Sequence, residues 1–389
     1  CFFAFQFAEA LRSAAAIDLF EKPWFRNNGW FKIFFHPPWC TYSHFGDSGT
    51  GGVDISDARN LACYAARYGT PEFRWFADRI PGPLDTSPYG YFLYDLPAAS
   101  RPPLGMVPAR HSADIGWVAM HSRLYRPDDV MLFAKASPYG SYSHGHADQN
   151  SFVIYAFGEP LAIDSGYYPW YGSAHHVQYA QQTKAHNTIL VGGEGQPIQD
   201  LHAGGQSLAY HGGTAFSYWL GDATAAYAGR LQRFHRHILH VPPEHFLIID
   251  DLAAPAPQRF QWLLHSMDQP EIRADDRAVI LRKGAARLAV QHLMPAELTQ
   301  DQTDDFGVPP ESRGTYRRQW HYTAETVATA PTARWATLLR ASQGPAEPAL
   351  TPATAEPGTD AVGVKARLDT SSLAAAVATD PAAETTAAG

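Results

Sequence analysis

Two histidines and an aspartate fall within five positions of the segment SYSHGHADQNSF, residues 141–152, directly before an apolar run that is typical of a β-strand. Either this is a polar loop that is rich in histidine, or His144, His146 and Asp148 hold something there. Imidazole nitrogens and carboxylate oxygens bind zinc, and imidazoles exchange protons near neutral pH. The neighbouring elements decide which partners these side chains can meet.

A predicted hairpin brings a second carboxylate toward this segment. The runs SFVIYA and PLAIDSG flank the turn-like FGE, and pairing them folds Asp164 back toward the start of the first run. Asp164 then lies a few residues, roughly 10–17 Å of extended chain, from His146. The run TKAHNTILV sets His186 ahead of another predicted strand. These three side chains can therefore converge as a recognised zinc set with water in the fourth position, although such trios also arise by chance.

The composition describes a globular chain of more than one domain. The 389 residues exceed what one ordinary core holds, and 45% are hydrophobic while 17% are charged. The net charge of −8 argues against nucleic acid as a partner, and the basic clusters at 229–237 and 313–318 are typical of solvated strand faces. No apolar run reaches the length of a membrane span. The three cysteines show no metal-type spacing and leave the compartment open.

The first part of the chain favours helices. Residues 1–110 contain a first helix that runs to about Phe20, and a later pair of helices with Ser56 or Asp57 as the cap and Gly69 as a stop. The chain starts with Cys rather than Met, inside an amphipathic helical pattern. We therefore expect that the natural N-terminus, with any secretion signal, precedes it.

The rest of the chain favours strands. Residues 111–345 contain at least ten short β-rich runs in series without intervening helices, which predicts a large antiparallel β-domain. Residues 346–389 form a tail that is rich in Ala, Thr and Pro. This tail is either a frayed end or the source of the final strands, because AVGVKARL and SLAAAVAT both have strand-like composition.

Long ordered runs surround the three candidate ligands. They are YGSYSHGHADQNSFVIYAFGEPLAIDSGYY and QQTKAHNTILVGGEGQ, followed by HFLIIDDL, QWLLHS and TDDFGVPPE. Together they resemble the signature of the heparinase II/III-like family of polysaccharide lyases over about residues 115–340. AIDLF, KPWFRNNGWFKI and SHFGD, within residues 17–47, are similar to the helical domain of alginate-lyase-like members. The motifs are long and keep their order, so the resemblance is specific.

The resemblance implies a fold and a metal site. The fold is a multidomain α+β architecture, in which part of an (α/α) toroid is followed by a large antiparallel β-sandwich, with the active site in the cleft between them. The resemblance also implies one zinc ion, mainly structural, in the β-domain. Its ligands, carried over by motif, are His146 of the HGH run, Asp164 of AIDSG and His186 of AHN. His144, the first histidine of that run, matches a histidine that faces the substrate.

A reaction is implied as well. These lyases cleave the glycosidic bond beside a uronic acid by β-elimination: the uronate carboxylate is neutralised, a base removes the C5 proton, and an acid protonates the departing O4. The expected partner is an acidic polysaccharide or oligosaccharide, either alginate or glycosaminoglycan-like, with endo or exo action left open. His144 is the catalytic candidate within this chain, because the family's main Tyr and His match helices upstream of its first residue.

Further side chains are candidates for contact with the substrate. They are Arg26, Tyr42, His44, Tyr168, His175 and Tyr179. Tyr168 and Tyr179 either line the wall of the cleft or belong to the core. His175 either contacts the sugar or is simply an exposed loop histidine. The TYSHFGD segment either lines the toroid end of the cleft or only connects helices. The arginine is a candidate partner for a uronate carboxylate.

Two other interpretations are weaker, and residues 112–340 lack the alternation of strands and helices that the first requires. HGHADQ resembles the HxHxDH run of metallo-β-lactamase-like hydrolases, but Gln149 stands where that run has a second-metal histidine. The stronger alternative is a zinc-stabilised β-module that binds acidic sugar without cutting it, since the main Tyr is not in this chain. The family likeness leads us to expect export to the periplasm or cell envelope, or secretion. The oligomeric state stays open, with a homodimer among the options.

Overall fold

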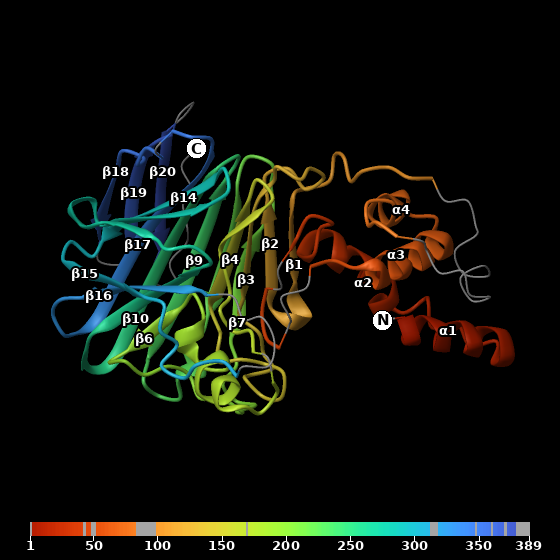
Figure 1. Cartoon of the computed structure of the whole chain (residues 1–389), viewed down its shortest axis with the longest axis horizontal. Coiled ribbons are helices and arrows are strands. Elements are labelled where there is room, and N and C mark those ends of the chain that lie inside the picture. Colours follow the sequence, from red (N-terminus) through yellow and green to blue (C-terminus); the bar gives the residue numbers. More distant parts are fainter. Residues whose placement is uncertain are drawn as a thin grey trace.

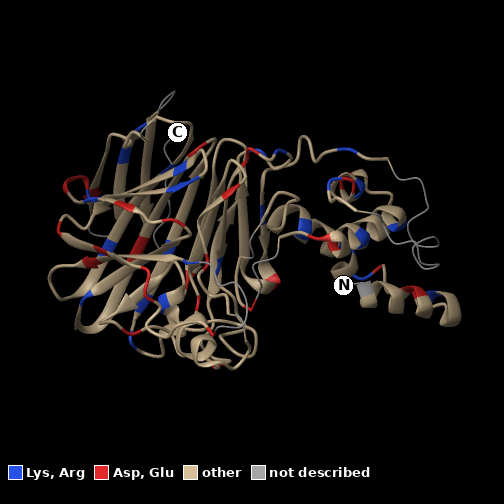
Figure 2. Ribbon diagram, viewed as in Figure 1, with Lys and Arg blue, Asp and Glu red and all other residues tan. Residues whose placement is uncertain are grey.

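The structure, a computed structural model, describes residues 2–41, 44–47, 52–82, 99–168, 170–311, 318–346, 348–358, 361–368 and 372–378. Helices lie on one side of the molecule, and stacked antiparallel sheets form the rest (Figure 1). Lys and Arg are interspersed with Asp and Glu over both parts (Figure 2). No helix among the described residues has the length and apolar character needed to cross a membrane.

The helical part contains four helices in the described ranges. They are α1 (Phe2–Ala15), α2 (Pro23–Phe35), α3 (Ile55–Tyr68) and α4 (Pro71–Ala77). The first helix ends at Ala15 rather than at the expected Phe20, because Ala16 adopts a positive φ of 56° that a helix cannot continue through. Phe20 is instead buried in the core of the helical part.

Local side-chain chemistry sets the ends of α3. The Asp54 carboxylate accepts hydrogen bonds from the backbone N–H groups of Ser56 and Asp57, and the Asp57 side chain accepts from the N–H of Asp54. Gly69 ends the helix with φ of 64°. The predicted stop at Gly69 is confirmed. The expected cap at Ser56 or Asp57 is wrong, because Asp54 is the residue with extended backbone directly before the helix.

Four antiparallel sheets form the β-part in the described residues. The five-stranded sheet has the order β1 (Ala109–Ser112), β2 (Trp117–His121), β3 (Val130–Lys135), β4 (Ser151–Ala156), β5 (Glu159–Ala162). The eight-stranded sheet has the order β12 (Glu271–Arg273), β13 (Ala278–Lys283), β14 (Ala286–Met294), β17 (Ala330–Gln343), β10 (His245–Gln258), β9 (Arg233–Val241), β8 (Ser217–Asp222), β7 (Gln206–His211). The four-stranded sheet has the order β15 (Leu298–Thr303), β16 (Trp320–Thr326), β11 (Phe260–Ser266), β6 (Ile189–Val191), and the three-stranded sheet has the order β18 (Ala353–Pro357), β19 (Ala361–Arg367), β20 (Ser372–Ala378).

The five-stranded sheet is buried on both faces. Val118, Leu132 and Ile154 belong to the core between the sheets, whereas the alternating neighbours Phe133 and Tyr155 join the cluster formed by the helices. Strands β3 and β4 are buried at every position, which explains why their sequences are apolar without polar alternation. The helices therefore pack on this sheet as a further layer.

Two buried histidines hold the end of α2 against the five-stranded sheet. Nε2 of His121 lies 2.7 Å from the carbonyl oxygen of Phe34, and its Nδ1 lies 2.7 Å from the Asp129 carboxylate. Nε2 of His44 contacts the carbonyl oxygen of Phe35, while its ring stacks on a β3 phenylalanine with 4.1 Å between centroids. These bonds satisfy carbonyl groups that a helix leaves unpaired at its C-terminus.

The tail contributes the strands that its composition suggested. Strands β18, β19 and β20 form a sheet at the end of the molecule opposite the helices (Figure 1). Val362, Val364 and Ala366 pack against Leu247 and Leu338 of the eight-stranded sheet. Most of these outer side chains are small aliphatic ones, whereas the helical layer is rich in aromatic side chains.

Candidate metal centre and its histidines

Side-chain bonds tie three loop segments together beside the five-stranded sheet. The predicted hairpin joins β4 to β5 through Phe157 and Gly158, both with positive φ, so this prediction is confirmed. The side-chain Nδ2 of Asn187 donates hydrogen bonds to the backbone carbonyl oxygens of Phe152 and Ile163, at 2.7 and 2.8 Å. The segment after β5 and the AHN segment are therefore held next to the start of β4.

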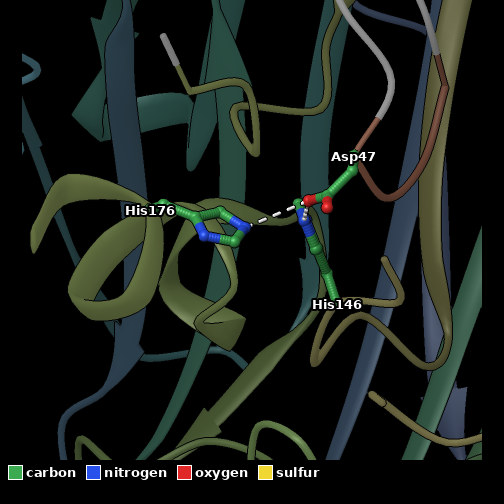
Figure 3. Close-up of side chains that lie close together, drawn as sticks. All are labelled: Asp47, His146 and His176. Atoms are coloured by element: carbon green, nitrogen blue, oxygen red, sulfur yellow. Dashed lines mark hydrogen bonds and ion pairs between the residues drawn. The ribbon is translucent and has the colours of Figure 1, made fainter. Parts of the chain in front are cut away.

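The carboxylate of Asp47, from the segment between α2 and α3, accepts hydrogen bonds from three histidines of the β-part, two of which, His146 and His176, are drawn in Figure 3. Oδ2 lies 2.6 Å from Nδ1 of His144, and Oδ1 lies 2.7 Å from Nε2 of His146. Oδ1 also lies 3.1 Å from Nε2 of His176. A backbone hydrogen bond also joins Asp47 to His144, because the N–H of Asp47 donates to the carbonyl oxygen of His144 at 3.1 Å. A buried carboxylate from the helical part therefore organises these imidazoles.

Asp47, His146 and His176 form one group of possible metal ligands, and a second group lies beside it. Asp148, Asp164 and His186 each offer a ligand atom within 4.8 Å of the others. The Asp164 oxygens lie 3.0 and 3.1 Å from Nδ1 of His186, and Asp148 pairs with the buried Lys135. The rings of His146 and His186 have centroids 5.3 Å apart, so the two groups are adjacent.

Gly166 leaves open the small space where the expected zinc ligands meet. A Cβ atom on Gly166 would lie 2.7 Å from Oδ1 of Asp164, 2.7 Å from Nδ1 of His146 and 2.8 Å from Cε1 of His186. Nδ1 of His146 and Nε2 of His186 are buried and have no hydrogen-bond partner in the described part of the chain. Buried polar atoms are rarely left this way. His146, Asp164 and His186 thus all border this space, but the possible ligand groups place His146 in one group and Asp164 with His186 in the other. A zinc ion held by all three therefore stays a prediction.

Burial and hydrogen bonding shift the ionisation of these groups in different directions. Burial disfavours the charged form of Asp47, but the bonds from His146 and His144 outweigh it and hold the pKa of Asp47 well below its usual range. Burial lowers the pKa of His146 against the opposing effect of Asp47. Burial also acts against protonation of His186, yet the Asp164 carboxylate raises the pKa of His186. At neutral pH, Asp47 is therefore ionised and His146 is mainly neutral, the form of imidazole that binds metals.

His144 is the histidine of this network that reaches solvent. Its side chain is 74% exposed, whereas those of His146 and His176 are 0% and 1% exposed. Its ring centroid lies 5.5 Å from that of the exposed Tyr171, which in turn lies 4.9 Å from that of His176. Since Nδ1 of His144 is bonded to Asp47, its Nε2 is the nitrogen available to a ligand in solvent.

Of the candidate substrate contacts, Tyr168 lies next to this network. Its ring centroid is 3.9 Å from that of His176, and burial together with a hydrogen bond to Asp47 raises the pKa of its hydroxyl. It is half-buried, so part of its ring remains accessible.

The structure buries two further candidates of the same region. Nδ1 of His175 lies 2.6 Å from the carbonyl oxygen of Val308, and the Tyr179 hydroxyl lies 2.7 Å from Oγ of Ser165. Both side chains belong to the interior, since His175 is 0% and Tyr179 is 3% exposed. The expected contact with substrate is therefore corrected for both, because neither side chain reaches the surface in this structure.

The candidates from the helical part are not brought to the metal centre. His44 is 3% exposed and packs between α2 and the sheet, so the expectation that it faces the substrate is corrected. Arg26 is exposed on α2 and pairs with Glu21 of the same part. Tyr42 lies outside the described residues.

Asp47 and His176 are the members of the network that the zinc prediction did not include. Asp47 is separated from His146 by 99 residues and from His176 by 129, so no local pattern connects them. The available signal is weak: SHFGD and SAHH are polar segments with titratable side chains and no helix or strand periodicity.

Heparinases share this fold. A crystal structure of heparinase III aligns with a TM-score of 0.73 at 16% identity, covering 96% of this chain and 58% of that one. Heparan sulfate lyase HepC from Pedobacter heparinus aligns with a TM-score of 0.69 at 14% identity, covering 90% of this chain and 52% of that one. The chain thus spans a little over half the length of these structures, and identities this low show the fold alone. No curated protein sequence matches the chain.

Sequence similarity to one family extends over most of the β-part. The profile "Heparinase II/III-like, C-terminal" matches residues 107–346, which is more than half of the chain. That range runs from just before β1 to just after β17 and includes His144 and all three expected zinc ligands. Through this domain, the chain belongs to the heparinase II/III-like family.

Proposed function

We propose that this chain carries the β-domain of a polysaccharide lyase that cleaves a uronic-acid-containing polysaccharide, alginate or glycosaminoglycan-like, by β-elimination. The observation that supports this most directly is the exposed His144, held by a buried carboxylate, beside a buried set of zinc-type ligands. Both lie within a domain of a lyase family. The names of the similar solved structures, heparinase III and heparan sulfate lyase, agree with an acidic polysaccharide as substrate.

In this proposal His144 acts at the C5 proton or at the uronate carboxylate. When a base takes the C5 proton, the electrons of that C–H bond form the C4–C5 double bond. The C4–O4 bond then breaks, and O4 leaves with a proton from an acid. A neutral imidazole with a free Nε2 can accept the C5 proton, and an ionised Asp47 stabilises the resulting imidazolium.

The zinc site is a proposal of its own. His146, Asp164 and His186 would hold one zinc ion, mainly in a structural role, because the three loops that carry them shape the surroundings of His144. When bound, the ion supplies positive potential close to the uronate carboxylate. His144 stays outside this ligand set, because its Nδ1 is committed to Asp47 and its other side faces solvent.

We further propose that the helices belong to an (α/α) toroid, whose remaining helices carry the tyrosine that completes the acid–base pair. The packing of the helices on the five-stranded sheet supports this, because Asp47 reaches His144 from that side. Export of the parent protein to the periplasm or cell envelope is proposed from the family alone. A complete coding sequence without a signal peptide would count against it.

The test is an activity assay on the protein that contains both this chain and the preceding toroid segment. Alginate, heparan sulfate and chondroitin-type polymers are incubated with it, and the ultraviolet absorbance of the unsaturated product is followed. We expect the absorbance to rise with at least one polymer. Binding of a polymer without any rise would instead support a zinc-stabilised, sugar-binding β-module.

A further inference from the structure

We propose that Asp47 is a positioning residue that fixes opposite tautomers in two histidines: the Nδ1–H form of His144 and the Nε2–H form of His146. The catalytic consequence for His144 rests on the proposed lyase function. The tautomers themselves follow from contacts within this chain, so they can be tested without any turnover.

The first half of the inference concerns His146. A neutral imidazole carries a single N–H, and the other nitrogen keeps a lone pair. Nε2 of His146 lies 2.7 Å from Oδ1 of Asp47, an acceptor, so Nε2 must carry the hydrogen. The lone pair is then on Nδ1, the buried nitrogen that lacks a partner and faces the space beside Gly166. Asp47 thereby presents the correct atom of His146 to the expected zinc position.

The second half concerns His144, where the same carboxylate bonds the other ring nitrogen. Nδ1 of His144 lies 2.6 Å from Oδ2 of Asp47, so Nδ1 carries the hydrogen and Nε2 carries the lone pair. The side chain is 74% exposed, which leaves Nε2 accessible to a substrate. A carboxylate in this position also stabilises the imidazolium that forms when Nε2 accepts a proton.

Contacts of the surrounding backbone hold Asp47 in place beside the rings of His144 and His146. The Asp47 N–H donates to the carbonyl oxygen of His144 at 3.1 Å. Gly46 has φ of +72°, and a Cβ atom there would lie 2.8 Å from the same oxygen, so glycine allows this close approach. His176 and the hydroxyl of Tyr168 also bond the carboxylate. The Asp47 side chain is 3% exposed, and water therefore competes little for its oxygens.

The substitution Asp47→Asn distinguishes a role of Asp47 in positioning the histidines from a role in filling space. Asp47→Asn keeps the size of the side chain, so a role limited to filling space would survive the change. It replaces one acceptor oxygen by an N–H donor, which must face at least one of the histidine nitrogens now bonded. That histidine then has to move its hydrogen to the other nitrogen or lose the bond.

The test reads the tautomers by long-range ¹H–¹⁵N correlation spectra of the chain labelled with ¹⁵N-histidine and freed of metal. The wild-type chain should show Nδ1–H for His144 and Nε2–H for His146. Asp47→Asn should convert at least one of them to the other tautomer. Zinc affinity, measured by competition with a chromophoric chelator, should fall by roughly 10–100-fold, as for other residues that orient a metal ligand.

Asp129→Asn is the matched control, because Asp129 is a buried carboxylate bonded to a buried histidine away from the metal centre. It removes an acceptor from Nδ1 of His121, and should leave both zinc affinity and the tautomers of His144 and His146 unchanged. The inference is overturned if wild-type His144 is in the Nε2–H form, or if Asp47→Asn keeps both tautomers and the zinc affinity. Should Asp47→Asn fail to fold, the wild-type spectrum decides by itself.

In the longer protein, Asp47→Asn should lower kcat while KM changes little, because the substrate-facing side of His144 is retained. A wild-type protein that is inactive on every uronate polymer would remove the proposed function but leave the tautomers as measured. The two failures are therefore distinguishable.

Discussion

The sheets of this molecule are covered at both ends, and the two covers differ in kind. The helical cover packs large aromatic side chains on the five-stranded sheet and places two buried histidines against the end of α2. The C-terminal cover, β18–β20, packs mostly small aliphatic side chains on the eight-stranded sheet. Both bury apolar surface, but the helical cover also sends the Asp47 carboxylate to the histidines of the β-part. We infer that the C-terminal cover serves stability, whereas the helical cover serves stability and the site.

The largest expected effect is on turnover. His144→Ala in the longer protein should lower turnover by roughly 10²–10⁴, the usual loss for an acid–base group, while zinc content stays unchanged. Val364→Ala, in the C-terminal cover, should leave turnover as it is. Activity assays with metal analysis check both. Near-normal turnover of His144→Ala, or loss of zinc from it, would show that His144 and His146 have been assigned the wrong way round.

The next effect compares the packing of the two covers. Phe133→Ala opens a cavity between the helices and the sheet, and should lower the free energy of unfolding by about 3–5 kcal/mol. Val364→Ala removes two methyl groups under the C-terminal cover and should cost about 2 kcal/mol. Urea unfolding of both variants measures the difference. Equal losses in the free energy of unfolding would contradict the inference that the two covers differ in how much their packing stabilises the chain.

Zinc removal should lower the stability of the chain. His186→Ala should abolish binding of one zinc per chain, and a chelator should lower the Tm of the wild type but not of this variant. A ligand at 100 times its Kd stabilises the native state by about 2.7 kcal/mol, which sets the scale of the shift. His175→Ala, a buried histidine that does not face Gly166, is the control and should keep its zinc. Well under one zinc per wild-type chain, unaffected by His186→Ala, is the outcome that would defeat the assignment.

The smallest effect is a dependence on pH. Burial lowers the pKa of His44 well below its usual value, so the native state keeps this imidazole neutral while the unfolded chain protonates it below about pH 6.5. The unfolded state then binds more protons, and stability falls as pH decreases below that value, by at most about 1.4 kcal/mol per pH unit. The protection of α2 amides against hydrogen exchange, corrected for the intrinsic exchange rate at each pH, should therefore fall between pH 7 and 5 more than that of β19 amides. His44→Gln should reduce the difference, and identical acid responses in α2 and β19 would argue against it.

The sequence by itself determined the local structure of this protein. The turn residues Phe157 and Gly158 between two apolar runs predict the β4–β5 hairpin, and Gly69 predicts the end of α3, because turns and helix ends depend on the conformations of a few adjacent residues. The change from helix-like to strand-like patterns predicted the order of the two parts. The motifs around His146, Asp164 and His186 also pointed to side chains that the structure brings around Gly166.

Only the tertiary structure decided which histidines are buried and which carboxylate they meet. His44, His144 and His175 all stand in polar loop sequences, yet His144 is exposed and the other two are packed inside. Asp47 lies 97 residues from His144 along the chain, and its contacts depend on how the helices pack against the five-stranded sheet. The physical reason is that periodicity and turn chemistry act between neighbours in sequence. Burial and long-range hydrogen bonds arise only when separate layers meet, and the same loop sequence can lie on either side of that contact.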